Sequence, residues 1–210
     1  MVRDDKGLDA TTTLLNVAVA PPAPVVGAVV EMSRELAGRG GLFELDNHSR
    51  HPHLTLYMAR FDIGNLDEIR ARLRDAVRGV RPFRVVHCGY HVTPGNYHEI
   101  SYTRDETLCG VHEKITNALR GRRYSPGRPV VEDYFGEYSA AQQANARDVG
   151  YDLAGELYRP HITLTRVKEG VTAEPLAVRA DLSFTASTVG LFEADRLGAA
   201  RRLIESLELN

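Results

Sequence analysis

Apolar and polar residues alternate along this chain in patterns that predict a mixture of strands and helices. The run at 14–20, apolar at every position except Asn16, predicts a buried strand, and the three prolines that follow predict the start of a helix ending near residue 36. Apolar residues at helical spacing predict two amphipathic helices, capped by Asn65 and Asp105. Strand-like patterns occupy 42–45, 53–61, 83–92, 97–103, 161–167, 182–184, 188–194 and 201–209.

Local signals add detail at two of these boundaries. Glu68 stands three residues after Asn65, the spacing of a capping box. Pro94 and Gly95 separate two strand patterns and suit the centre of a type II turn, so this region is expected to be a hairpin.

The order of elements predicts an α+β fold of two similar lobes. Two antiparallel sheets would line a central cleft, with the helices outside. We expect residues 1–210 to form a single domain with a loose polar tail at 1–12. The segment 121–158 is the least regular part and is expected to be an insertion or lid, with a helix at 139–147.

Composition narrows the classes of partner. The 210 residues carry 26 Lys and Arg against 28 Asp and Glu, a net charge of −2, which argues against a wide footprint on long DNA. No basic region precedes an apolar run, so neither a signal peptide nor a membrane span is expected. Two cysteines without C-x-x-C spacing favour a reducing cytoplasm, and we expect a monomer.

Two strand segments repeat the same chemistry. Residues 52–56 read Pro-His-Leu-Thr-Leu, and residues 160–164 read Pro-His-Ile-Thr-Leu. Because side chains alternate along a strand, the histidine and threonine of each segment share one face, and the apolar residues point into a core. The four residues expected to meet in one cleft are His53, Thr55, His161 and Thr163.

The same parity extends the predicted cleft face outward. Tyr57 on the first strand, with Arg159 and Thr165 on the second, become candidates for substrate binding. The alternative is a pair of core strands whose histidines are simply hydrogen-bonded. A polar face this wide in an apolar strand is costly unless it lines a wet cleft, which favours the functional interpretation.

A pair of histidines suits phosphoryl chemistry. Histidine titrates near neutral pH, so one imidazole can take a proton from a nucleophile while the other gives one to a leaving oxygen. The threonine hydroxyls can donate to the non-bridging phosphoryl oxygens. No cofactor is expected. A metal site around His48, His51 and His53 is the alternative, but no second group with ligand spacing stands beside them, and His51 is expected at the rim.

With both His-x-Thr motifs and the lead-in at 158–161, the chain resembles the 2H phosphoesterase superfamily, and in particular the bacterial RNA 2′,3′-cyclic phosphodiesterases, also called 2′–5′ RNA ligase-like proteins. The resemblance implies a bilobal α+β fold whose two lobes are related by a pseudo-two-fold axis. It also implies hydrolysis of a 2′,3′-cyclic phosphate or a 2′–5′ phosphodiester in RNA ends or small nucleotides. It further implies that His53 protonates the leaving ribose oxygen and His161 activates water, although the internal symmetry leaves the reverse open.

The segment 121–158 departs from the compact family pattern. Arg122, Arg123 and Tyr124 could form an electropositive lip that stacks a base and holds a phosphate, or a solvated loop. We expect the segment to wall or cover the cleft and to bring an arginine to a second phosphate. Its other basic and aromatic residues are Arg128, Tyr134, Phe135 and Tyr138.

Two further function classes remain open. A nucleotide- or RNA-binding module without turnover would keep the cleft but would not need both imidazoles. A metal hydrolase would lose activity in a chelator. The remaining histidines are expected on the surface or in the hairpin, and they are His87, His91, His98 and His112.

Overall fold

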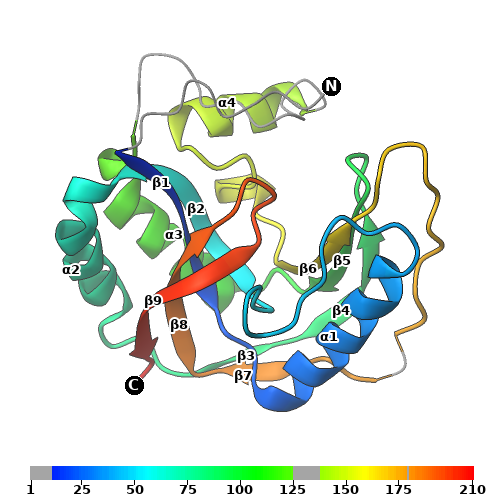
Figure 1. The fold of residues 1–210 in the computed structure, drawn as a ribbon. Coiled ribbons are helices and arrows are strands. Elements are labelled where there is room, and N and C mark those ends of the chain that lie inside the picture. The colour runs from blue at the N-terminus through cyan, green and yellow to red at the C-terminus, as the bar shows by residue number, and fades with distance from the viewer. Residues whose placement is uncertain (1–10, 125–137, 179) are drawn as a thin grey trace.

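The computed structural model describes residues 11–124, 138–178 and 180–210 (Figure 1). Most of the expected tail, residues 1–10, lies outside this range, and Thr12 already belongs to a strand. The described residues form antiparallel sheets with helices packed against them, so the predicted α+β class is confirmed.

The first sheet has four antiparallel strands in the order β2-β1-β8-β9. They are β2 (Leu54–Asp62), β1 (Thr12–Val19), β8 (Thr188–Ala194) and β9 (Ala200–Glu208). Two helices pack against this sheet, α2 (Leu66–Val77) and α3 (Glu106–Leu119). Figure 1 shows them together on one side of the molecule. The first histidine motif therefore enters the sheet on β2.

The second sheet carries the second motif. Its strands run β4 (His87–Val92), β5 (Tyr97–Tyr102) and β6 (His161–Arg166), and α1 (Ala23–Ala37) packs against β6 (Figure 1). A two-stranded ladder joins β3 (Phe83–Val85) to β7 (Phe184–Ala186). The helix from the start of the chain thus supports the sheet that holds the later motif.

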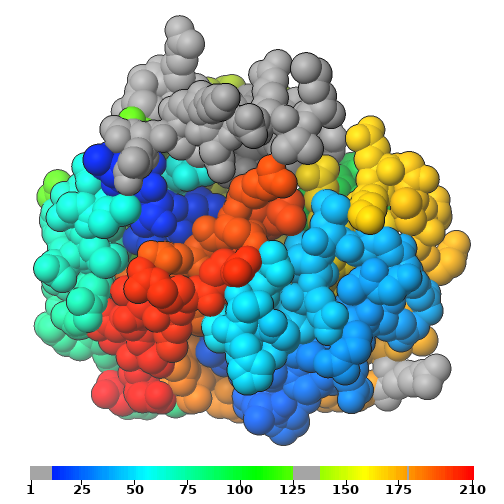
Figure 2. Space-filling view, viewed as in Figure 1, coloured from blue at the N-terminus to red at the C-terminus, as the bar shows by residue number. Residues whose placement is uncertain are grey.

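The shorter elements complete the fold. Among the described residues, single-turn 3₁₀ helices occupy Ile63–Asn65, Arg120–Arg122 and Gly155–Leu157. The expected helix at 139–147 is confirmed as α4 (Ala140–Asp148), which Figure 1 shows above β2. Ser139 and Gln142 form a capping box at its start. On the face shown in Figure 2, the segment from α1 to β2 lies beside β9, and the His51 N–H donates to the Ala200 carbonyl at 2.9 Å.

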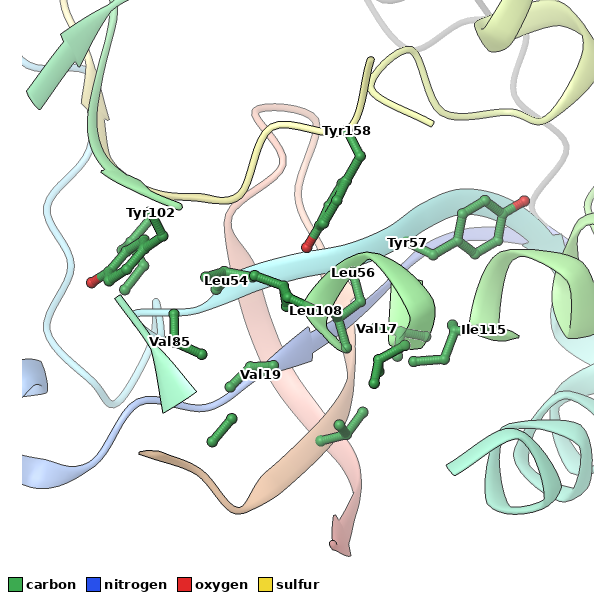
Figure 3. Close-up of a cluster of buried hydrophobic side chains, with 14 of the residues drawn as sticks. Val17, Val19, Leu54, Leu56, Tyr57, Val85, Tyr102, Leu108, Ile115 and Tyr158 are labelled. Atoms are coloured by element: carbon green, nitrogen blue, oxygen red, sulfur yellow. The ribbon is translucent and has the colours of Figure 1, made fainter. Parts of the chain in front are cut away.

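The core explains why the motif strands are apolar between their polar residues. Leu54 and Leu56 of β2 are fully buried, and Figure 3 shows Leu108 of α3 beside Leu56. Ile162 and Leu164 are fully buried at the matching positions of β6. Each such side chain contributes about 1.5–3 kcal/mol on burial, which holds the alternate histidine and threonine on the opposite face.

Two expected strands differ in the structure. The run at 83–92 is two strands, because the first pairs with β7 and the second with β5, and Val86 between them is exposed. Residues 42–45 do not form a strand. The Leu42 N–H donates to the Arg166 carbonyl as in a strand pair. The N–H groups of Phe43 and Leu45, however, donate to the side-chain hydroxyls of Thr165 and Ser33 and not to backbone carbonyls.

Two local signals also resolve differently. The 94–95 hairpin is confirmed, but it is not a type II turn, because the positive φ of 61° belongs to Asn96 and not to Gly95. The prediction of a capping box at Asn65 is wrong. Asp62 instead accepts the Gly64 N–H, since a 3₁₀ turn precedes α2, and Asn65 makes no side-chain cap. The Asp105 cap of α3 is confirmed.

Candidate active site

The two motif histidines are anchored in the same way. Nδ1 of His53 lies 2.7 Å from the carbonyl oxygen of His51, and Nδ1 of His161 lies 2.7 Å from that of Arg159. A carbonyl oxygen only accepts, so each Nδ1 carries a hydrogen and donates it. This anchoring leaves Nε2 as the nitrogen with which each imidazole can exchange a proton.

Both histidines and both motif threonines line one cavity with a volume of about 170 Å³. They reach it from two different sheets, β2 on one side and β6 on the other. The structure therefore brings the histidine and threonine of both motifs together in one cavity, as strand parity led us to expect. The other residues that line this cavity include Met58, Tyr97, Glu99, Tyr138, Gln142, Tyr151, Asp152, Leu153 and Arg159.

A β-bulge follows the threonine in each motif strand. In β2, Val17 pairs with Tyr57 and Ala18 with Thr55, so Leu56 is the extra residue. In β6, His98 pairs with Thr165 and Glu99 with Thr163, so the extra residue is Leu164. An extra residue reverses the side-chain parity of everything after it.

The bulges overturn two predicted site residues. Tyr57 and Thr165 were expected on the cleft face, but both point away from it and are fully buried. The Tyr57 hydroxyl donates to the Val149 carbonyl at 2.6 Å, and burial raises the pKa of this phenol. The Thr165 hydroxyl donates to the Phe43 carbonyl at 2.6 Å. Met58, one residue further along β2, takes the place on the cleft wall.

Each bulged leucine has its carbonyl satisfied by the helix behind it. His112 of α3 donates from Nδ1 to the Leu56 carbonyl at 2.5 Å, and Ser33 of α1 donates to the Leu164 carbonyl at 2.7 Å. The same two side chains accept backbone N–H groups. His112 Nε2 accepts from Gly155 at 3.1 Å, and the Ser33 hydroxyl accepts from Leu45 at 2.8 Å. Each therefore links one motif strand to the segment that leads into the other.

His112 was expected on the surface, and this prediction is wrong. The residue is 1% exposed, and its ring stacks on Tyr158 with 3.9 Å between centroids. Tyr158 in turn donates to the Thr55 carbonyl at 3.0 Å, and Figure 3 shows its hydroxyl directed toward β2. Burial lowers the pKa of His112, in keeping with a neutral ring that donates once and accepts once. His98 is also buried, and its Nδ1 bonds the Tyr90 hydroxyl at 2.7 Å.

Arg159 lies in the cleft lining as expected, and it is paired with a carboxylate that strand parity did not reveal. Its guanidinium forms an ion pair with Glu99 of β5, whose side chain is only 4% exposed. The other oxygen of Glu99 lies 3.5 Å from Nε2 of His161. Glu99 reaches this point because β5 pairs with β6 and places it opposite Thr163.

His53 has an apolar environment. It is 6% exposed, and the Phe192 ring lies beside it with centroids 6.5 Å apart. Burial lowers the pKa of His53 to about 4, against the opposing effect of its hydrogen bond to the His51 carbonyl, and nearby His161 lowers it further. His53 is therefore neutral at pH 7. Its partner Thr55 accepts a hydrogen bond from Asn16 Nδ2 at 3.0 Å, which leaves the threonine hydrogen available to donate.

The structure does not bring the predicted arginine lip to the cleft. Arg122 pairs with Glu68 at 2.9 Å, and Arg123 donates to the Arg147 and Asp148 carbonyls at the end of α4. The Tyr124 N–H extends the edge of β2 by donating to the Arg60 carbonyl at 2.6 Å. None of the three lines the cavity. Arg128, Tyr134 and Phe135 lie outside the described residues.

The later part of the same segment does line the cleft. Tyr138, Gln142 and residues 151–153 contribute to its wall. The charged residue among them is Asp152, which is acidic. Gln142 Nε2 donates to its carboxyl at 3.1 Å, and burial raises the pKa of this carboxyl. Asn145 holds the Asp152 and Ala154 carbonyls at 3.1 and 2.8 Å, so α4 fixes this wall in place.

The described residues contain no group of three or more His, Cys, Asp or Glu side chains arranged to hold a metal ion. His51, one of the histidines of the alternative metal site, lies beside Phe192 with ring centroids 5.7 Å apart. Within the same residues, every helix is too short or too polar to cross a bilayer.

Comparison with known proteins places the fold. No family model and no curated protein matches the sequence. Among solved structures, the protein TT0787 of Thermus thermophilus matches with a TM-score of 0.66 at 19% identity, over 93% of this chain and 97% of that one. Escherichia coli LigT in complex with phosphate matches with a TM-score of 0.59 at 15% identity, over 96% and 99%.

A second LigT structure, in complex with 3′-AMP, matches with a TM-score of 0.54 at 16% identity, over 95% of this chain and 99% of that one. These neighbours are 2H phosphoesterases, and the alignments span nearly the whole of each chain. The fold that the two motifs led us to expect is confirmed.

Proposed function

We propose that this protein is a phosphodiesterase that hydrolyses a 2′,3′-cyclic phosphate or a 2′–5′ phosphodiester of an RNA end or small nucleotide, by acid–base catalysis with two histidines and without a metal ion. The observation that carries the proposal is the pair of identically anchored imidazoles, both lining one cavity beside a threonine hydroxyl. The catalytic residues would be His53, Thr55, His161 and Thr163.

The reaction needs one proton acceptor and one proton donor on opposite sides of a phosphorus atom. One imidazole takes a proton from water as the water oxygen bonds to phosphorus. The bond from phosphorus to the ribose oxygen breaks on the far side, and the second imidazole gives that oxygen a proton. The threonine hydroxyls donate to the non-bridging oxygens, where negative charge grows in the transition state. Atoms and charge balance without a cofactor.

The substrate class is proposed from two sources. The LigT neighbours were crystallised with phosphate and with 3′-AMP, which are a product-like anion and a small nucleotide. In the present chain, the wall formed by Tyr138, Tyr151 and Leu153 offers aromatic and apolar surface beside the histidines. A nucleobase or ribose could rest on that wall while its phosphate lies between the imidazoles.

The alternative is a nucleotide-binding module without turnover. Two observations favour catalysis. A binding cleft has no need for both imidazoles to present the same nitrogen, and His53 stays neutral at pH 7, as a proton acceptor must.

The test is an activity panel run in excess chelator. It contains nucleoside 2′,3′-cyclic phosphates, 2′–5′ and 3′–5′ dinucleotides and an RNA with a cyclic end, and the products are separated by chromatography. We expect turnover of the cyclic phosphates or 2′–5′ dinucleotides and none of the 3′–5′ dinucleotides. The double variant His53→Ala, His161→Ala from a parallel preparation controls for contaminating nuclease. Tight binding without turnover would identify a binding module, and activity lost only in chelator would identify a metal hydrolase.

A further inference from the structure

One polar side chain interrupts the apolar strand in the middle of the first sheet. β1 lies between β2 and β8, and every residue from Leu14 to Val19 is buried. Asn16 is the polar member of this run, and it is fully buried. Moving an amide from water into an apolar strand costs free energy unless its hydrogen bonds are replaced. The partners of Asn16 therefore show what this residue supports.

The amide of Asn16 bonds two residues of β2. Its Nδ2 donates to the Thr55 hydroxyl oxygen at 3.0 Å and to the Met58 sulfur at 3.7 Å. Both partners line the cavity that holds the two histidines, whereas Asn16 does not reach it. The carbonyl oxygen of the same amide is buried and has no hydrogen-bond partner among the described residues. A buried carbonyl without a partner lowers stability, so a contribution to folding does not explain this residue.

The sulfur of Met58 determines which way the amide points. A thioether accepts hydrogen bonds weakly and has no hydrogen to give, so the group that faces it is the amide NH₂ and not the carbonyl oxygen. The strand register pairs Met58 with Asn16 across the β1–β2 ladder, which holds the two side chains together. The NH₂ group therefore also faces Thr55, and the threonine oxygen receives a hydrogen from it.

This contact restricts the hydroxyl of Thr55. Because one lone pair of its oxygen accepts from Asn16, the hydroxyl hydrogen must point away from that nitrogen. Thr55 lines the cavity, so its hydrogen is available to a phosphoryl oxygen placed there. A donor that is oriented beforehand does not have to reorganise when negative charge develops on that oxygen.

We infer that Asn16 is a positioning residue that fixes the hydroxyl of Thr55 as a donor toward a non-bridging phosphoryl oxygen. This inference rests on the proposed function and extends it to a residue outside the cavity. Asn16 does not touch the reacting atoms, and it acts through the threonine. The cost of its buried amide is then offset by its effect on catalysis and not by an effect on folding.

The other half of the site carries a different side chain at the matching position. The residue two positions before the strand partner of each motif threonine is Asn16 in the half of Thr55 and Tyr97 in the half of Thr163. Thr163 therefore lacks this amide, and it provides an internal control for the effect of Asn16 on Thr55.

The first experiment separates positioning from packing. Asn16→Leu keeps the approximate shape of the side chain and removes the amide with its unpaired oxygen. Urea titration should therefore give an unfolding midpoint equal to or above that of the normal protein. In steady-state kinetics on the preferred substrate, kcat should fall about tenfold and KM should change less than about twofold, because the lost interaction strengthens in the transition state.

Thr116→Val is the matched control for this substitution. It removes another buried polar group that has no partner among the described residues, and it lies on α3 outside the cavity lining, so kcat should stay unchanged. A folded Asn16→Leu variant with normal kcat would overturn the inference.

A double-mutant cycle tests whether Asn16 acts through Thr55, and it uses the smaller change Asn16→Ala. In a Thr55→Val background, Asn16→Ala should lower kcat further by less than about twofold, because the hydroxyl that it orients is already gone. In a Thr163→Val background, the same change should still lower kcat about tenfold. Equal losses in the two backgrounds would show a general effect on the site and would overturn the inference. Circular dichroism on each variant checks that it is folded.

The same cycle can be measured by binding, which does not depend on turnover. The probe is inorganic phosphate, titrated by calorimetry. Asn16→Ala should weaken phosphate binding about threefold in the normal and Thr163→Val proteins and leave it unchanged in Thr55→Val. This pattern in a protein that turns over no substrate of the panel would count against the proposed function and leave the action of Asn16 on Thr55 established. Turnover without this coupling in either measurement would support the proposed function and overturn the inference.

Discussion

The β1–β2 half and the β5–β6 half of the cleft share a framework and differ in surroundings. Both present a histidine anchored through Nδ1 to the carbonyl two residues earlier, and both place a bulge after the threonine. Around His53 lie apolar groups, whereas around His161 lie Glu99 and Arg159. The repeated motif therefore specifies where the two imidazoles lie, and the neighbouring strands specify which side chains surround each of them.

The bulges show that the framework is itself cross-linked between halves. Ser33 and His112 each donate to a bulged leucine carbonyl and accept an N–H from the segment that leads to the other motif. The helix α3, which carries His112, packs on β2 and holds the segment that leads to β6. The helix α1, which carries Ser33, packs on β6 and holds the segment that leads to β2. Both strands are thus positioned by one reciprocal arrangement, which explains how two sheets can keep two imidazoles in register.

The largest expected effect on turnover comes from substituting either motif histidine. His53→Ala and His161→Ala should each lower kcat about 100- to 10,000-fold, because each loses a proton-transfer partner. Steady-state rates on the preferred substrate of the panel measure this, with thermal melting as the control for folding. If either variant kept more than a tenth of the normal rate, the two halves would not both be catalytic.

The next largest effect is expected on the free energy of unfolding when the hydrogen bonds of Ser33 or His112 are removed. Ser33→Ala and His112→Phe each leave a buried leucine carbonyl and one N–H, of Leu45 or of the half-buried Gly155, without a side-chain partner, at a cost of about 2–4 kcal/mol of unfolding free energy. Urea titration measures the loss for each. Thr116→Val on α3 is the matched control, since the buried Thr116 hydroxyl bonds no other group among the described residues, and its removal should be nearly neutral. A large loss in only one of the two variants would show that the halves are supported differently.

The burial of His53 should make the free energy of unfolding depend on pH. The pKa of His53 is about 4 when folded and near 6.5 when unfolded, so between these values the unfolded chain binds the additional proton. The contribution of His53 to stability is therefore complete above about pH 6.5 and is lost as pH falls toward 4. Between pH 7 and pH 5 the loss should be about 2 kcal/mol. Urea titrations of the normal protein and of His53→Gln should differ in acid sensitivity by this amount, and parallel curves would contradict it.

The smallest expected effect concerns the wall at 138–153. We had expected an arginine here to hold a second phosphate, and the structure presents Asp152 instead. A negative carboxylate disfavours an additional phosphate by about 1 kcal/mol, or roughly fivefold. Asp152→Asn should therefore raise kcat/KM for a cyclic mononucleotide with a 5′-phosphate more than for the same nucleotide without it. An equal change for both substrates would mean that the wall does not select by charge.

Local periodicity in the sequence was enough for much of this protein. The apolar spacing located the helices, although α2 ends at Val77, before the last apolar position of its pattern, and the shared parity of His and Thr brought the two motifs to one cleft. Both are properties of a single segment, because a strand repeats every two residues and a helix every 3.6. The repeat of one motif at two positions was sufficient to expect a fold with two similar halves.

Tertiary structure decided what depends on segments far apart in the chain. An extra residue at Leu56 and Leu164 turned Tyr57 and Thr165 away from the cleft, and only strand pairing reveals such a bulge. Likewise, Glu99 reaches Arg159, 60 residues later in the chain, and His161 beyond it through the register of β5 against β6. Pairing register and side-chain partners minimise buried unpaired polar groups across the whole molecule, so no single stretch of sequence contains that information.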